Sequence, residues 1–368
     1  ILWYCTDQQR FDTIGALGNA HVVTPSIDRL VEHGVAFTHA YCQSPICTPS
    51  RSSFMTGMYP SRVHSTRNGN ESFPSWPPVI TRLIADAGYH CGMVGKFHLQ
   101  SSGHRTEPRI DDGFAFWRFS HAPRDDWEQG HDYADWVRSN GGDLDAMRQS
   151  EDRVSPELHQ TTWASEQAIE FIDQASGKDQ PWLLNVNIYD PHPPFIPPRQ
   201  YAERFDPAAM PGPHFRESDL IQQRRLASLD FQDELKTPDE HDALRVQANY
   251  YAMIAQIDDQ FARILQALEE SGQRDNTVVI FTSDHGEALG DHGLMFKGCR
   301  FYEGLVRVPL IFSWPRKFQT GLVSDALVEL LDLSSTLIEL AGLPCPDYMQ
   351  GKSLMPILCG RADPNYLR

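Results

Sequence analysis

The sequence predicts an α/β fold in which helices cover both faces of a doubly wound, mostly parallel sheet. Short apolar runs typical of buried strands alternate along the chain with longer segments that have the periodicity of amphipathic helices. Acidic, basic and imidazole side chains follow directly after several of these runs, and ligands of such sheets bind beyond the carboxyl ends of the strands. The 368 residues suffice for one large domain or two smaller ones.

The expected elements alternate from the first residue onward. Proline or a short polar residue marks several helix starts, and glycine follows several helix ends. The strands are expected over residues 1–6, 89–95, 181–188, 276–282 and 308–312, and helices over residues 24–34, 77–88, 158–175, 244–271 and 330–341.

Two longer segments lack a clear period. Residues 100–157 are rich in Asp, Trp, His and Gly, and residues 197–243 are irregular and rich in proline. Loops of this length inside a compact domain are usually functional or disordered. The many aromatic residues of the first segment favour an ordered insertion near a site.

Charge and composition exclude several classes of partner. The formal net charge is −17, which argues against binding to nucleic acid or to an anionic membrane surface. A small anionic substrate stays compatible with this charge, because nearby cations can outweigh the global field. No apolar run reaches eighteen residues, so no transmembrane helix is expected.

The seven cysteines are scattered and have no C-x-x-C spacing, which indicates neither a disulfide framework nor a zinc ribbon. This slightly favours a reducing, cytoplasmic compartment. The chain starts inside an apolar run and without methionine, so we expect its natural N-terminus to lie upstream. A signal peptide could belong to that part, which leaves the periplasm and secretion open.

The segment Cys47-Thr48-Pro49-Ser50-Arg51 contains a candidate nucleophile. Thr48 suits the N-cap of a helix and Pro49 its first position. Cys47 is then expected just outside the helix N-terminus, where free backbone N–H groups lower the pKa of a thiol. Arg51 would project from the first turn to the same place. The alternative is a buried free cysteine beside a surface arginine.

Polar residues at the ends of four expected strands are predicted to meet at one edge of the sheet. They are Asp7 and Gln8, Lys96 and His98, His192, and Asp284 and His285. Carboxylate and amide oxygens suit Ca²⁺ or Mg²⁺, and an imidazole also permits Mn²⁺ or Zn²⁺. Taken singly, the acids could instead cap the following helices, and the histidines could be ordinary residues of strand ends and turns.

These motifs resemble those of the type I sulfatases. The quoted cysteine segment, continued by Met55-Thr56-Gly57, is similar to the sulfatase signature, and Gly95-Lys96-Phe97-His98-Leu99 and Ser283-Asp284-His285-Gly286 resemble two further family motifs. The resemblance implies an alkaline phosphatase-like fold, with a sulfatase catalytic domain over residues 1–368 and a small C-terminal subdomain largely absent. It also implies that a sulfatase-maturing enzyme oxidises Cys47 to Cα-formylglycine, whose hydrate is the nucleophile, with Arg51 supporting it.

The resemblance further assigns roles to the polar residues. One divalent metal would be held by Asp7, Gln8, Cys47 after modification, Asp284 and His285. Calcium is the usual family metal, although Gln8 replaces an acid and His285 a commoner asparagine. Lys96 and His98 would contact the nucleophile and the sulfate, with His98 removing the proton whose loss releases sulfate. The remaining assignments are His192 and Lys297 at the leaving-group oxygen, Asn68 at the substrate, and His292 and Glu303 as supporting residues.

The implied function is hydrolysis of a sulfate monoester, on a carbohydrate or an aryl alcohol. Carbohydrate is preferred because Trp117, Trp127 and Trp136 lie in the first irregular segment. A phosphonate monoester or phosphodiester hydrolase with the same formylglycine is an alternative. The Asp-Gln and Asp-His pairs favour it, whereas Lys96 and His98 argue against it. A non-catalytic protein that binds sulfated ligands is a third reading, which requires Cys47 to stay a thiol.

Overall fold

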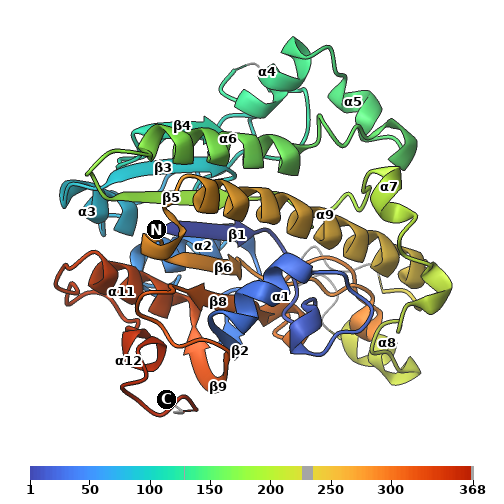
Figure 1. Ribbon diagram of the computed structural model, residues 1–368. Coiled ribbons are helices and arrows are strands. Elements are labelled where there is room, and N and C mark those ends of the chain that lie inside the picture. The colour runs from blue at the N-terminus through green and yellow to red at the C-terminus, as the bar shows by residue number, and fades with distance from the viewer. Residues whose placement is uncertain (128, 226–234, 366–368) are drawn as a thin grey trace.

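The computed structural model describes residues 1–127, 129–225 and 235–365. A nine-stranded sheet forms its centre, in the order β4-β3-β5-β1-β6-β8-β2-β7, with β9 also paired to β2. Figure 1 shows the sheet between two layers of helices. The strands are β1 (Leu2–Thr6), β2 (Val35–Tyr41), β3 (His90–Gly95), β4 (Phe116–Phe119), β5 (Trp182–Asn187), β6 (Val279–Ser283), β7 (Arg307–Val308), β8 (Leu310–Ser313) and β9 (Leu322–Glu329).

The sheet is mostly parallel, as predicted. Strand β1 pairs in parallel with both β5 and β6, and β3 pairs in parallel with β4 and β5. Only β7 and β8 run against their neighbours among the described strands. Because β1 lies in the middle and is fully buried, it reads as a continuous apolar run. The carboxyl ends of β3, β5, β1 and β6 therefore lie side by side.

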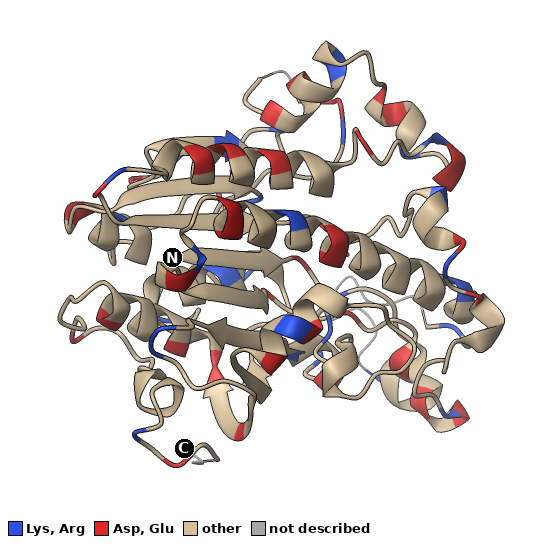
Figure 2. Cartoon of the chain, viewed as in Figure 1, with Lys and Arg blue, Asp and Glu red and all other residues tan. Residues whose placement is uncertain are grey.

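Two apolar cores lie on opposite faces of the sheet. One contains the buried sides of α2 (Cys47–Thr56), α3 (Ile80–Asp86), α11 (Leu330–Leu340) and α12 (Met355–Leu358). The other contains those of α1 (Pro25–Glu32), α4 (Asp132–Ser139), α6 (Gln160–Ala175) and the long α9 (Ala243–Glu270). The remaining helices are the short α5 (Leu144–Met147), α7 (Arg199–Ala202), α8 (Glu217–Arg224) and α10 (Glu303–Val306), with 3-10 turns η1 (Gly15–Leu17), η2 (Glu151–Arg153), η3 (Pro207–Ala209), η4 (Arg274–Asn276) and η5 (Asp291–Gly293). Figure 2 shows acidic positions along α6 and α9.

The structure corrects the sequence analysis at several elements. Strands β2, β4, β7 and β9 were not expected, and β4 shows that the segment 100–157 contributes an edge strand to the main sheet. The irregular segment 197–243 contains α7 and α8, and part of it lies outside the described residues. In the described part of the chain, no helix combines the length and the apolar character needed to cross a membrane.

Helix α1 is held by a carboxylate from α9. Asp258, which is fully buried, accepts hydrogen bonds from the backbone N–H groups of Ser26 at 3.0 Å and Ile27 at 2.8 Å. We expect Asp258→Ala to lower the free energy of unfolding by about 1–3 kcal/mol, because the buried N–H of Ile27 and the half-buried N–H of Ser26 lose their acceptor. Urea denaturation checks this. Asp259→Ala is the matched control, since Asp259 is paired with Arg204 at the surface, and this variant should lose less than about 1 kcal/mol. Equal losses would contradict the interpretation.

Candidate active site

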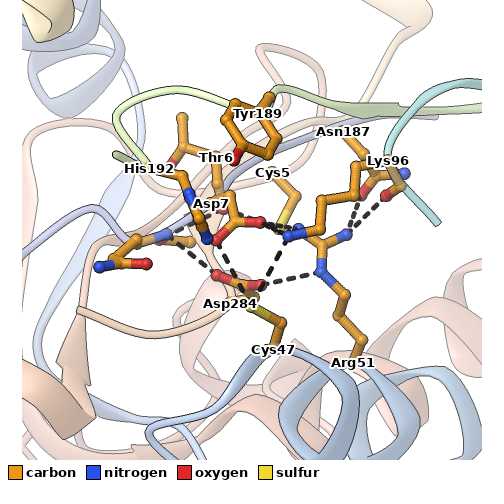
Figure 3. Close-up of polar contacts among 12 residues, drawn as sticks. Cys5, Thr6, Asp7, Cys47, Arg51, Lys96, Asn187, Tyr189, His192 and Asp284 are labelled. Carbon is orange, nitrogen blue, oxygen red and sulfur yellow. Dashed lines mark hydrogen bonds and ion pairs between the residues drawn. The ribbon is translucent and has the colours of Figure 1, made fainter. Parts of the chain in front are cut away.

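The polar residues predicted at the strand ends do meet at one place. Asp7 and Gln8 follow β1, Lys96 follows β3, and Asp284 and His285 follow β6. Figure 3 shows Asp7, Lys96, Arg51 and Asp284 converging beside Cys47, with His192 and Tyr189 from the segment after β5 next to them. All of these residues are buried except His192, which is partly exposed.

Helix α2 brings Cys47 to this place, although it begins earlier than predicted. Its N-cap is Ile46 in an extended conformation, and Cys47 is its first residue, so Thr48 and Pro49 lie inside the first turn. Asn68 takes the capping role from outside the helix: its Oδ1 accepts the backbone N–H of Thr48 at 3.0 Å. Cys47 therefore lies at the positive end of the helix, as the cysteine motif indicated.

Cationic groups surround the Cys47 thiol, which is completely buried. Its Sγ lies 3.2 Å from His285 Nε2, 3.6 Å from Lys96 Nζ and 3.7 Å from Asp7 Oδ1. Burial by itself raises the pKa of a thiol, but Lys297, Lys96 and His285 outweigh it and hold the pKa of Cys47 well below its ordinary value. The site is thus built to hold negative charge at position 47.

Arg51 connects the helix to the strand ends. Its Nε donates to Asp284 Oδ2 at 2.8 Å, and one of its terminal nitrogens donates to the carbonyl oxygen of Lys96 at 2.7 Å. Asp7 Oδ2 lies 3.7 Å from the other terminal nitrogen and also accepts a hydrogen bond from Lys96 Nζ. Burial and the neighbouring Cys47 oppose ionisation of Asp7, yet Lys96, followed by His192 and Lys297, keeps its pKa below the usual value. Asn187 at the end of β5 accepts a further hydrogen bond from Arg51 at 3.3 Å.

The donor set fits a divalent cation. One atom each of Asp7, Cys47, Asp284 and His285 lies within 4.8 Å of the others, and all four residues are buried. His285 Nδ1 must carry its proton, because its partner at 2.8 Å is the carbonyl oxygen of Gly286. Its Nε2 faces the centre, and the neutral form of His285 would present a lone pair there, which is the arrangement a metal-binding histidine needs.

Gln8 lies beside this cluster with its amide already engaged. Its Oε1 accepts a hydrogen bond from Lys297 Nζ at 2.9 Å, and its Nε2 donates to the buried carboxylate of Glu287. Its backbone N–H donates to Asp284 Oδ1 at 3.1 Å. The left-handed backbone of Gln8, with φ of 75°, directs the chain across the cluster.

Two histidines face the centre as neutral bases. Burial, with the charge of Lys96, lowers the pKa of His98 to about 4, and its buried Nδ1 has no hydrogen-bond partner in the described residues. His192 Nδ1 donates to the carbonyl oxygen of Pro193 at 2.8 Å, which leaves the lone pair on Nε2. Burial, followed by the charge of Lys297, also lowers the pKa of His192.

Residues 1–343 match the family model described as Sulfatase. This chain belongs to the sulfatase family. The sulfatase is 30% identical to an arylsulfatase of Clostridium perfringens, over 97% of this chain and 78% of that protein. It is also 30% identical to the uncharacterized sulfatase YidJ of Escherichia coli, over 97% of this chain and 70% of that protein. The phosphonate monoester hydrolase structure of Agrobacterium radiobacter superposes with a TM-score of 0.82 at 27% identity, covering 98% of this chain and 77% of that one. The sulfatase thus shares its alkaline phosphatase-like fold with phosphonate hydrolases.

The sulfatase site also contains residues that the sequence analysis missed. They are Asn187, Tyr189, Glu287 and His121, whose ring lies 4.7 Å from that of His98. Asn187 and Glu287 had a signal, since one is a polar residue at the end of an apolar strand and the other extends the Ser-Asp-His-Gly motif. His292 and Glu303 do not join the centre. The contacts of His292 are with Asp219 and Tyr302, and those of Glu303 are with Tyr41 and Arg307.

Proposed function

We propose that this sulfatase hydrolyses sulfate monoesters, with Cys47 acting as the nucleophile after oxidation to Cα-formylglycine. The observation that supports this most directly is the position of Cys47. It lies at the N-terminus of α2, completely buried, among cations and potential metal ligands. A merely structural cysteine is normally surrounded by apolar side chains. Here the thiol is surrounded by Lys96, His285 and Asp7 instead.

Formylglycine and a divalent cation would each supply a defined part of the chemistry. A hydrated formylglycine offers one hydroxyl for attack on sulfur and a second through which the sulfate can later be released. A divalent cation, Ca²⁺ or one of Mg²⁺, Mn²⁺ and Zn²⁺, would lower the cost of negative charge at position 47. We assign this cation to Asp7, Asp284, His285 and residue 47. Gln8 would be a fifth ligand, once its Oε1 no longer accepts the hydrogen bond from Lys297.

The protein side chains would perform the positioning and the proton transfers. Arg51 fixes the carboxylates of Asp284 and Asp7, and Lys96 donates toward residue 47 and a bound sulfate. His98, neutral and without a partner on Nδ1 in the described residues, is suited to remove a proton from residue 47.

His192 and Lys297 are placed to serve the leaving-group oxygen. His192 Nε2 carries a free lone pair, and Lys297 Nζ already donates a hydrogen bond on the same side of the cluster. Either can assist departure of the alcohol. We propose that Asn68 contacts the substrate from the exposed edge of the site, since its side chain is exposed and accepts a hydrogen bond from the first turn of α2.

A sulfated carbohydrate is the substrate that we favour. Among the relatives, an N-acetylglucosamine-6-O-sulfatase of Bacteroides thetaiotaomicron is 25% identical over 97% of this chain. The tryptophans are weaker support than the sequence indicated. Trp127 is buried with its ring 5.7 Å from that of His121, and the half-buried Trp117 stacks on Phe119 against one of the cores. Trp136 stacks on Tyr133.

A phosphonate monoester or phosphodiester hydrolase is the second candidate, supported by the Gln8 and His285 positions and by the Agrobacterium radiobacter structure. Mass spectrometry of the Cys47 peptide and turnover of three esters with the same aryl leaving group test both proposals. The protein should be produced in a host with a sulfatase-maturing enzyme. We expect an aldehyde at position 47, and a kcat/KM for the sulfate ester at least about 10-fold above those of the phosphodiester and the phosphonate, or about 1.4 kcal/mol. An aldehyde with the opposite order would select the second candidate. If Cys47 remained an unmodified thiol and none of the three esters were hydrolysed, the result would favour a non-catalytic protein that binds sulfated ligands.

A further inference from the structure

A small cavity adjoins the site on the side of His192. Its volume is about 40 Å³, room for about three water molecules or for the oxygens of one carboxylate or sulfate group. The segment after β5 forms one wall with Tyr189, Asp190 and His192, and Arg148 and His159 contribute from the segment between α5 and α6. Figure 1 shows α4 and α5 together at one end of the molecule, beyond the end of α6.

Arg148 is an unusual arginine for this protein. It directly follows α5 and is half-buried. Its Nε is fully buried and has no hydrogen-bond partner, and within residues 1–127, 129–225 and 235–365 no carboxylate forms an ion pair with it. The net charge of the chain is −17, and acids accompany many of its other arginines, such as Arg138, which pairs with both Asp125 and Asp135.

The acid in the same cavity is directed elsewhere. Asp190 Oδ2 accepts the hydroxyl of Thr161 at 2.6 Å and lies 3.6 Å from His159 Nδ1. Thr161 lies in the first turn of α6 and His159 is its N-cap, so the carboxylate is held against the start of this helix. Among the described residues, no ion pair joins Asp190 to Arg148, so the guanidinium has no bonded acid within the cavity.

A buried N–H of a guanidinium that has lost water and has no partner costs free energy, which an anion can offset. The planar N–H fork matches the paired oxygens of a carboxylate or a sulfate. The cavity lies next to His192, which is proposed to face the leaving-group oxygen. A group in the cavity would therefore belong to the alcohol part of the substrate rather than to the sulfate that is cleaved.

We propose that Arg148 forms a subsite for a second oxyanion on the leaving-group alcohol. The substrate class is then a sulfated sugar that carries a further sulfate or a carboxylate. This inference rests on the proposed sulfatase function and narrows its substrate.

The test compares Arg148→Met with wild type on matched substrates. Glucosamine 6-sulfate has a single anion, glucosamine 2-N,6-O-disulfate adds a sulfate, and a sulfated glucuronic acid adds a carboxylate. We expect wild type to have a kcat/KM at least 10-fold higher on one dianionic sugar than on glucosamine 6-sulfate. Arg148→Met should lower that ratio 10- to 100-fold, and the preferred dianion tells sulfate from carboxylate recognition. Arg153→Met, which alters an exposed arginine nearby, should keep the ratio of wild type.

Equilibrium binding keeps the inference testable if turnover is absent. We expect the disulfate or the sulfated uronate to bind Arg148→Met at least 10-fold more weakly than wild type, measured by calorimetry on the whole protein. Wild type without preference for a dianion, or a variant with an unchanged ratio and affinity, would overturn the subsite. Failure of the sulfatase proposal would look different, since wild type would then turn over none of the sulfate esters, including an aryl sulfate.

Discussion

Cys47→Ala is expected to lower the kcat/KM for an aryl sulfate by at least about 10⁴-fold, the scale on which enzymes lose activity without their nucleophile. The side chain that would be oxidised and attack sulfur is then absent, and the cations around it have no anion to stabilise. Initial rates on the purified variant, made beside wild type in the same host, measure the loss. The variant should still fold, because alanine is compatible with the helix and because the change removes the negative thiolate that lies against the Asp7 carboxylate. The loss of activity would then reflect the missing nucleophile and not unfolding.

Cys42→Ala is the matched control for this result. Cys42 is also a buried thiol, but its contacts are the backbone oxygens of Ser44 and Leu305. It should keep the activity of wild type within about a few-fold, because volume loss there acts on packing alone. Residual activity of Cys47→Ala near that of Cys42→Ala would show that the nucleophile lies elsewhere.

Arg51→Ala is expected to have the largest effect on stability, a loss of about 3–5 kcal/mol, together with loss of activity. The guanidinium is 1% exposed, and its removal leaves Asp284 and Asp7 as buried carboxylates without this cation. It also removes donors to the carbonyl oxygen of Lys96 and to Asn187. A shift of the urea midpoint at unchanged slope measures the stability change.

Arg51→Lys serves as the comparison, since it keeps one charge but not the fork that reaches both the carboxylate and the strand ends. It should recover part of the stability and little of the activity. Arg245→Ala is a surface control, because Arg245 pairs with Asp242 in an exposed position. Equal stability of Arg51→Ala and Arg245→Ala would mean that the buried network contributes nothing to folding.

The strands and helices that the sequence predicted are those with a strong pattern. Strand β1 is buried on both faces, so its sequence is a continuous apolar run. Helix α9 buries one face, so its apolar residues recur with the helical period. Both patterns can be recognised from the local sequence alone. Strand β9 alternates buried and exposed residues, but its polar Ser324 and Asp325 interrupt the apolar alternation. Strand β2 carries Thr38 and His39 in its middle. The sheet, rather than local preference, makes these segments strands.

The site shows the same division. That Asp7, Lys96 and Asp284 would meet followed from parallel strands, since their carboxyl ends share one edge. The direction of the Gln8 amide, the approach of His121 and the unpaired state of Arg148 depend on loops that fold back over long distances. No local pattern encodes those contacts, so the sequence alone could not reveal them.

The position of β1 in the middle of the sheet also sets the order of events during synthesis. His285, which lies against Cys47, is made 238 positions later in the chain, and β1 must wait for β5 and β6 before it has neighbours. At about 5–20 residues per second, the ribosome takes about 12–48 s to cover that distance. During this interval the thiol is open, and once the strands have paired it is 0% exposed. An enzyme that oxidised Cys47, as proposed here, would therefore compete with folding, and slower translation between these positions would give it more time.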